Sequence, residues 1–343
     1  MSWTAAVVAL SLVASWIWWR ESGTAARWRF EAAMKTYCGG LLAHERSELY
    51  DGLWHETDLR LDQRYGPEAH RCMLGLTEVT VVRVTRDDLR TLNLDRVLLP
   101  LKGDRLPVPL PGGWRGVTNG HSIRVVSDCR GGDAAVAVTI SPYFPSGHRE
   151  RPEDGWFGMD EEWVRFATAT VVKAADRWNC AVEKGTRVRE LPAPAGPRGT
   201  GRAEGTCAGL PFARDKRFDT VTETPASALA VSERCEVHGR ADYFDASYLL
   251  AAHFGPFAER ARRNQEAYGE AGRSEYSMWA TAHCPGDPAR AHFSVSIPPE
   301  ASVEYHMDRE NEPREETFGL PALTEFAKRS ADRHGCTDLR LPR

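Results

Sequence analysis

The hexapeptide Ala175-Asp-Arg-Trp-Asn-Cys180 returns near the end of the chain as Ala331-Asp-Arg-His-Gly-Cys336. Each copy closes a set of four cysteines, and the two sets have nearly the same spacing: Cys38, Cys72, Cys129 and Cys180, then Cys207, Cys235, Cys284 and Cys336. The flanks of the earlier cysteines also agree, since Arg71 and Arg234 each precede the second cysteine of their set. Matched positions in matched order indicate a repeated structural unit. The sequence therefore predicts one small cysteine-bridged domain present twice.

Both repeats mix strand patterns with helix patterns. In the first, β-branched residues and alternation predict strands over 78–85, 122–126 and 135–141, after a helical turn over 41–50. A helix over 161–179 follows, with Asp160 as its N-cap. In the second, helices are expected over 256–269 and from about Pro321 onward, with strands over 274–282 and 291–297. The predicted fold class is α+β: two tandem homologous domains, each a small antiparallel sheet backed by its C-terminal helix.

Four cysteines in a repeat allow three pairings, and a duplicated domain should use the same pairing twice. We expect the first cysteine to pair with the second and the third with the fourth. Each bridge would then close a loop of a few tens of residues and contribute about 4 kcal/mol by chain entropy. Zinc is the alternative use of a cysteine quartet, but structural zinc sites favour closely spaced Cys-x(2-4)-Cys pairs, and the sequence has none.

Residues 3–19 carry no charge and are rich in aliphatic and aromatic side chains. This length is at the short limit for a membrane-spanning helix, and the tryptophans at 16, 18 and 19 stand where an interfacial aromatic belt would lie. We therefore expect an uncleaved N-terminal transmembrane helix. A signal peptide cleaved near Gly23-Thr-Ala25 and a helix buried in the core are the alternatives.

The orientation of such a helix is ambiguous. Arg20, Arg27, Arg29 and Lys35 all follow the apolar stretch, and the positive-inside tendency would place the large domain in the cytoplasm. Two cysteine quartets instead indicate an oxidising compartment, and long domains translocate largely regardless of charge. We expect a single-pass protein of the cell membrane, with the membrane as a partner through residues 3–19 and the bulk of the chain extracytoplasmic.

The expected domain organisation follows from these features. Residues 1–21 would form the anchor and 22–35 a juxtamembrane stalk, with the first repeat over 36–184 and the second over 206–343. Residues 185–205, rich in proline and glycine, would form the linker between the repeats.

Composition limits the classes of partner. A hydrophobic content of 42% and a charged content of 27% are typical of a folded protein. A formal net charge of -4 gives no electrostatic reason to expect nucleic-acid binding.

No catalytic signature occurs in the sequence, so no catalytic residue, metal ligand or cofactor is predicted and the protein is not expected to be an enzyme. His44-Glu45 begins like a zincin motif, but Glu48 stands where the second histidine should be. His283 and His334 could pair with Asp287 or Asp332, although solvated polar residues are the simpler interpretation.

Two tryptophans are candidate binding residues. Trp114 ends a proline-rich stretch, and Trp156 follows a polar loop, so either ring could stack on a sugar or peptide. Burial at the edge of a sheet is the alternative for each.

An N-terminal apolar helix followed by domains that begin Cys38-Gly-Gly-Leu-Leu and end in Ala-Asp-Arg-x-x-Cys resembles uncharacterised membrane-anchored extracytoplasmic proteins of actinobacteria. More distantly, it is similar to their four-cysteine cell-envelope sensor domains. The resemblance implies a cell-envelope setting and a non-enzymatic role, with no ligand residue to carry over. The leading hypothesis is a binding or sensing module for an envelope protein, glycan or lipid. The alternatives are an anchored hydrolase with its site between the repeats and a structural assembly component.

Overall fold

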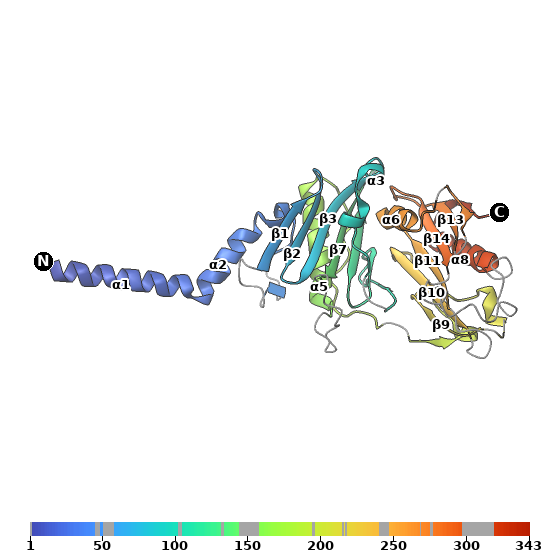
Figure 1. Cartoon of the computed structure of the whole chain (residues 1–343), viewed down its shortest axis with the longest axis horizontal. Coiled ribbons are helices and arrows are strands. Elements are labelled where there is room, and N and C mark those ends of the chain that lie inside the picture. The colour runs from blue at the N-terminus through green and yellow to red at the C-terminus, as the bar shows by residue number, and fades with distance from the viewer. Residues whose placement is uncertain are drawn as a thin grey trace.

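A computed structural model of the chain describes residues 2–44, 49–50, 58–101, 105–131, 134–143, 158–193, 196–214, 216, 218–239, 247–267, 269–274, 277–296 and 319–343. Two β-sheets stand side by side, and a long N-terminal helix projects from the first of them (Figure 1). The molecule is mixed α and β, as predicted, with antiparallel pairing throughout both sheets.

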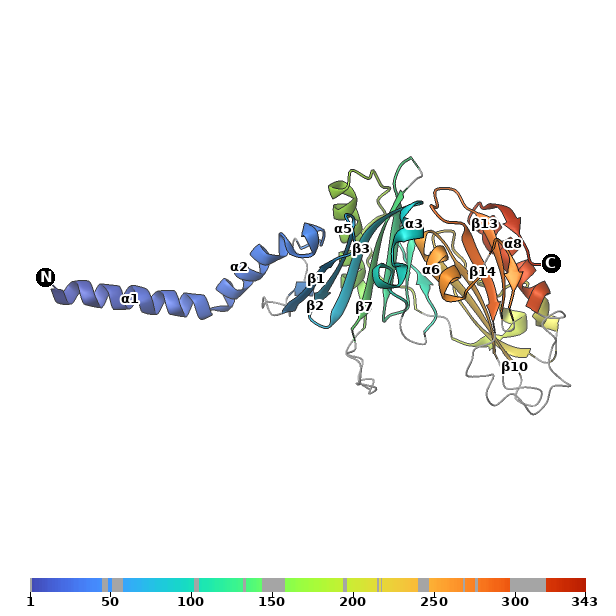
Figure 2. The same ribbon diagram turned by 45° about the horizontal axis from the view of Figure 1, so that its top comes forward.

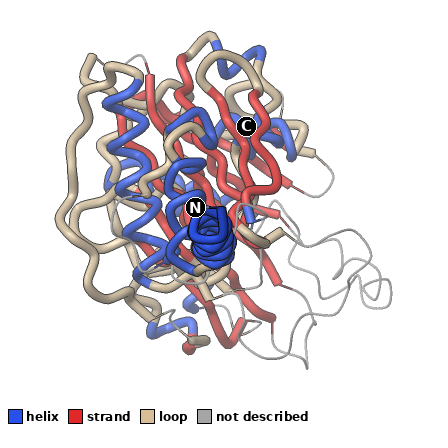
Figure 3. Tube along the Cα trace, turned by 90° about the vertical axis from the view of Figure 1, so that its left-hand side faces the viewer, coloured by secondary structure: helices blue, strands red, loops and turns tan. Residues whose placement is uncertain are grey.

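Two helices form the N-terminal arm. Helix α1 (Ser2–Glu21) and helix α2 (Gly23–Met34) are separated at Ser22, whose hydroxyl caps α2 by accepting from the Ala25 N–H. Figure 1 shows α1 extending away from both sheets, and Figure 3 shows the same helix end-on. The far end of α2 belongs to the folded part of the molecule, because Phe30 and Met34 are buried in the first hydrophobic core.

The expected transmembrane helix is not supported. Within the part of the chain that the structure describes, no helix is long and apolar enough to cross a membrane.

The first sheet has seven strands in the order β1-β2-β3-β7-β6-β5-β4. Its strands are β1 (Leu59–Arg64), β2 (Ala69–Leu74), β3 (Thr77–Thr85), β4 (Val108–Pro109), β5 (Gly116–Thr118), β6 (Ile123–Asp128) and β7 (Ala134–Pro142). Short helices α3 (Asp88–Thr91) and α4 (Leu94–Val97) follow β3, the 3-10 turn η1 (Tyr37–Gly40) carries the first cysteine, and helix α5 (Glu161–Arg177) covers one face.

The second sheet follows the order β12-β13-β14-β11-β10-β9-β8, and β15 pairs with β13 off this path. Its strands are β8 (Arg198–Gly199), β9 (Phe218–Glu223), β10 (Ser232–Gly239), β11 (Ser247–His253), β12 (Gly272–Arg273), β13 (Ser277–His283), β14 (Ala291–Ser296) and β15 (Thr337–Arg340). Helix α6 (Pro256–Asn264) follows β11, helix α8 (Gly319–Arg333) covers one face, and 3-10 turns η4 (Thr200–Arg202) and η5 (Pro211–Arg214) precede β9.

The strand orders show the duplication directly. The path β1-β2-β3-β7-β6-β5 in the first sheet corresponds, in chain order, to β9-β10-β11-β14-β13-β12 in the second. The second cysteine lies on β2 or β10, and the third follows β6 or β13. The two halves therefore share one topology, as the cysteine pattern predicts.

The two covering helices end in the same way. The N–H of Cys180 donates to the Ala175 carbonyl, as the N–H of Cys336 does to the Ala331 carbonyl. The residue before each cysteine, Asn179 or Gly335, has a positive φ, the conformation that ends many helices. The shared hexapeptide is therefore a helix stop that presents the fourth cysteine to the sheet.

Four disulfides form with the predicted pairing: Cys38–Cys72, Cys129–Cys180, Cys207–Cys235 and Cys284–Cys336. All eight cysteines are used, so none is left as a thiolate ligand for zinc. In each repeat the second bridge ties the end of the covering helix to the sheet.

The repeats pack against each other through the sheet faces that α5 and α8 do not cover. Figures 1 and 2 place α3 and α6 between the two sheets. A third hydrophobic core joins Val82, Val84 and Val126 of the first sheet to Val231 and Phe257 of the second repeat. Arginines complete this junction: Arg115 bridges Asp128 and the buried Asp287, while Arg263 donates to carbonyls at the end of α3.

Several predicted elements need correction. The helical turn expected over 41–50 is absent at residues 41–44, because the turn η1 ends at Gly40, and residues 45–48 lie outside the described part of the chain. Helix α6 ends at Asn264 rather than near residue 269. The strands expected over 78–85, 122–126 and 135–141 are present within one or two residues.

Candidate functional site

A groove of about 790 Å³ opens on the surface of the first repeat, between α5 and the segment that follows Cys180. We call residues 181–188, which have no helix or strand assignment, the strap. Phe166, Ala169 and Val172 line the groove from α5, Trp114 lines it from the loop before β5, and the strap contributes its last five residues. Ala43 and His44 complete the wall.

Helix α5 is rigidly placed. The Asp160 carboxylate caps it by accepting from the N–H groups of Glu162 and Trp163, as predicted. Its inner face is buried against β6 and β7 through Val164, Ala167 and Val171. The groove therefore uses the outer edge of a helix whose other side is fixed in the core.

The strap is held against the Trp114 loop by close backbone contact. The Thr186 N–H donates to the Gly112 carbonyl over 2.7 Å, and the Trp114 indole N–H donates to the Thr186 carbonyl over 2.8 Å. A Cβ on Gly185 would lie 2.6 Å from the Gly112 oxygen and 2.8 Å from ring carbons of Trp114. The strap reaches this position only because residue 185 has no side chain.

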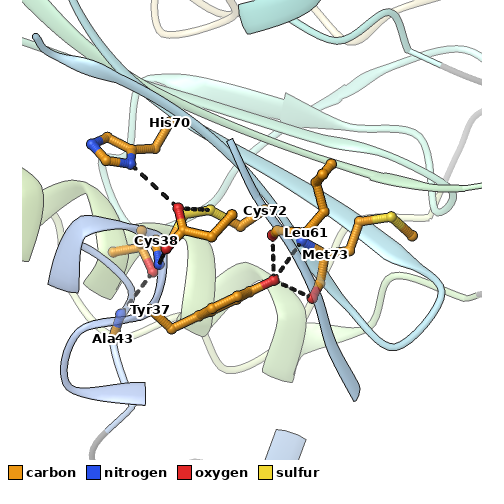
Figure 4. Close-up of a disulfide and its surroundings, with 9 residues drawn as sticks. Tyr37, Cys38, Ala43, Leu61, His70, Cys72 and Met73 are labelled. Atoms are coloured by element: carbon orange, nitrogen blue, oxygen red, sulfur yellow. Dashed lines mark hydrogen bonds and ion pairs between the residues drawn. A yellow bond between two sulfur atoms is a disulfide. The ribbon is translucent and has the colours of Figure 1, made fainter. Parts of the chain in front are cut away.

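The first disulfide, Cys38–Cys72, lies close to the segment that supplies Ala43 to the groove wall (Figure 4). Beside it, the Tyr37 hydroxyl accepts from the Met73 N–H, and the Cys38 N–H donates to the Asp62 carboxylate over 2.8 Å. The chain then turns toward α5, where the Ala43 N–H donates to the Thr170 hydroxyl. The bridge thus fixes the segment that ends in His44 at the edge of the groove.

The groove is lined by more positive than negative side chains. Its positive residues are Arg165, Lys173, Lys184 and Arg187, and its negative residues are Glu162 and Asp176. Arg165 is paired with Glu162, and the hydrogen bond that its guanidinium donates to that carboxylate raises the pKa of Arg165. Lys173 donates to the Leu42 carbonyl over 2.8 Å and lies 3.0 Å from the His44 Nδ1.

The two strap cations have a different environment. Lys184 and Arg187 are exposed, and within the described residues no ion pair or hydrogen bond engages either side chain. An apolar floor with unpaired cations at one rim favours a ligand that combines an apolar part with negative charge.

Of the two predicted binding residues, the structure places one at this groove. Trp114 lines it, but its side chain is only 7% exposed and its indole N–H is bonded, so the ring forms the floor rather than an open stacking platform. Trp156 lies outside the described residues. The binding role of both side chains remains a prediction.

Most groove residues were missed by sequence reasoning because they lie in the stretch expected to be a linker or on the exposed side of a helix. The glycine and the two cations of Lys184-Gly-Thr-Arg187 are a weak signal, since such residues also occur in ordinary loops. Besides Trp114, His44 is named from the sequence among the lining residues, but for a zincin motif that it does not complete.

The histidine pairs considered from the sequence are not formed. His334 stacks on Phe254 with 3.6 Å between ring centroids, and its Nε2 lies 3.1 Å from a carboxylate oxygen of Glu233. Asp287 instead accepts from the Gly255 N–H and pairs with Arg115. His334 is therefore a buried structural group and not the solvated residue that was expected.

The junction between the repeats, where an enzymatic site was one alternative, contains two smaller cavities among those described, of about 360 and 290 Å³. Arginines dominate the charged side chains there, including Arg260, Arg262, Arg263 and Arg290. Much of the remaining junction is filled by the third hydrophobic core.

Comparison of the chain with protein-family models finds no match, and comparisons with curated proteins and with solved structures likewise find none. The geometry of the site is thus the basis for a functional proposal.

Proposed function

We propose that this protein is an extracytoplasmic binding protein, and that the groove between α5 and the strap is its recognition site for an anionic ligand with an apolar part. The groove carries this proposal: it joins an apolar floor at Trp114, Phe166 and Val172 to a rim that includes Lys184 and Arg187. Its walls are fixed by a disulfide, a capped helix and a glycine contact. A preorganised site loses little conformational entropy when a ligand binds.

The compartment is part of the same proposal. The four disulfides use all eight cysteines. Disulfides form and persist in oxidising compartments and are uncommon in a reducing cytosol, so this pattern supports an extracytoplasmic location. Trp16, Ile17 and Trp18 of α1 are each at least half exposed, which supports insertion of this helix into or onto a lipid bilayer. Membrane flotation of the full chain, with and without substitution of Ile17 and Trp18 by serine, tests this placement; recovery of both forms in the soluble fraction would contradict it.

The groove is tested with a small probe of the proposed chemistry. We expect 4-(trifluoromethyl)phenylacetate, an aromatic carboxylate, to bind the full chain in lipid nanodiscs and to broaden its fluorine NMR signal. Ala169→Trp should abolish the broadening, because Ala169 is exposed and lines the groove. The matched control is Glu325→Trp at the corresponding position of α8, which should leave it unchanged.

Charge is tested separately. Arg187→Glu should weaken probe binding about tenfold, since it replaces an attractive rim charge by a repulsive one. Arg189→Glu makes the same change two residues along, outside the groove lining, and should have little effect. Equal broadening by the parent protein, Ala169→Trp and Arg187→Glu would remove the groove as the binding site.

A further inference from the structure

We infer that the ligand of the groove is an acidic peptide in extended conformation, which adds to the free backbone edge of the strap. This inference rests on the proposed function and narrows the ligand class. Three features support it: the backbone hydrogen bonds of the strap, the charges that surround its open edge, and the apolar residues that line the groove.

The strap already behaves as a paired strand on one side. Both backbone groups of Thr186 are engaged toward the Trp114 loop, the N–H by the Gly112 carbonyl and the C=O by the Trp114 indole. In a β-strand the N–H and C=O of one residue point to one side and those of its two neighbours to the other, and the contacts of Thr186 match this arrangement. The backbone groups of Gly185 and Arg187 thus form a second edge.

This second edge is unpaired. Across the described part of the chain, no hydrogen bond reaches the backbone N–H or C=O of Gly185 or Arg187. The next carbonyl, that of Val188, is bonded by the Arg165 side chain from α5. The open edge therefore spans Gly185 to Arg187, and its backbone groups could pair with an extended peptide by β-augmentation.

The surrounding charges select the peptide. Lys184 and Arg187 stand at the two ends of the open edge, Lys173 lies across the groove on α5, and all three line it. Alternate side chains of an extended peptide point to opposite sides. Acidic side chains on one side would meet these cations, while apolar side chains on the other would contact Phe166 and Val172.

The charge requirement is tested with the hexapeptide acetyl-Glu-Val-Glu-Leu-Glu-Val-amide and an analogue in which lysine replaces each glutamate. Fluorescence anisotropy measures the affinity of each peptide for the full chain in nanodiscs. We expect the acidic peptide to bind and the lysine peptide to bind at least tenfold more weakly. Two further versions carry N-methyl groups on the odd or on the even residues. Because a strand pairs through one edge, one methylated version should lose about tenfold in affinity and the other should not.

A backbone variant gives a second test. Arg187→Pro removes the N–H that Arg187→Ala retains, so it should weaken peptide binding further than the alanine variant at equal melting temperature. Equal affinity of both methylated peptides, or equal affinity of the two variants, would overturn strand addition. If no peptide binds but the aromatic carboxylate does, the ligand is not a peptide and the proposed binding groove stands. If the carboxylate also fails to bind, both the peptide inference and the proposed binding groove are wrong.

Discussion

The two repeats share one topology and one helix stop, yet they use the covering helix differently. In the first, α5 leaves an open groove beside the strap, whereas in the second the chain after the fourth cysteine forms β15 and pairs with β13. The second helix is also fastened by charge, because the fully buried Glu233 accepts from Ser330 and Arg333 of α8 and lies 3.1 Å from His334. One scaffold therefore leaves a groove beside its covering helix in the first copy, whereas the second copy adds a strand after its fourth cysteine.

Two of the residues that contact Glu233 lie in the hexapeptide that closes the second repeat, so the first hexapeptide shows which residues stand at the same positions in the first repeat. Arg333 and His334 of the second copy correspond to Arg177 and Trp178 of the first, and Arg177 is exposed. The contacts of Ser330, Arg333 and His334 lower the pKa of Glu233 although burial alone would raise it. The carboxylate is thus ionised inside the second repeat, whereas among the described residues of the first no side chain pairs with Arg177.

The largest expected difference in stability between the repeats comes from substituting the equivalent arginines, Arg333 and Arg177. Arg333→Gln should cost about 3 kcal/mol, because a buried carboxylate loses its main cationic partner. Arg177→Gln should change the free energy of unfolding by less than about 0.5 kcal/mol, as is usual for an exposed side chain. Urea titrations of both variants under non-reducing conditions measure this contrast, and equal losses would show that the fastening is not specific to the second repeat.

A second contrast appears with pH. His292 on β14 is fully buried, and burial lowers its pKa to about 4, well below the ordinary value of 6.5. Below pH 6.5 His292 is protonated in the unfolded chain but stays neutral in the folded chain. The free energy of unfolding therefore decreases as the pH falls toward 4. Between pH 7.5 and 5 the loss from this group is about 2 kcal/mol.

The variant His292→Gln should flatten this dependence. The measurement is the difference in unfolding free energy between pH 7.5 and 5, which does not depend on how much the substitution destabilises the protein at neutral pH. His253, whose pKa is also lowered by burial, remains in both proteins and contributes equally to both. An unchanged pH difference would contradict a neutral, buried His292.

The smallest expected effect concerns the strap. Gly185→Ala should displace the strap from Trp114, at a cost of about 1 to 2 kcal/mol typical of overpacking, and should expose the indole to water. Gly201→Ala is the control, since a Cβ there meets nothing within 4 Å. Thermal unfolding and the wavelength of tryptophan emission report the two effects, and a Gly185→Ala protein identical to the control in both would refute the close contact.

The sequence was most informative where the signal is local. The alternation over 135–141 and the apolar face of 161–179 identify β7 and α5 closely, because burial on one or both faces leaves a clear pattern. Strands β1, β9 and β10 were missed. The exposed edge strand β1 carries mainly polar residues, and β10 includes Glu233 and Arg234, whose burial depends on partners elsewhere in the chain.

By itself, the sequence determined the duplication, the disulfide pairing and the α+β class, because cysteine spacing and helix ends are chemical properties of short segments. Only the tertiary structure decided that Gly112 meets Gly185, that Arg115 reaches Asp287, and that Glu233 is enclosed by α8. These contacts join segments many residues apart, and their stability depends on desolvation and close approach. The groove is formed by such contacts, so it cannot be predicted from any single stretch of sequence.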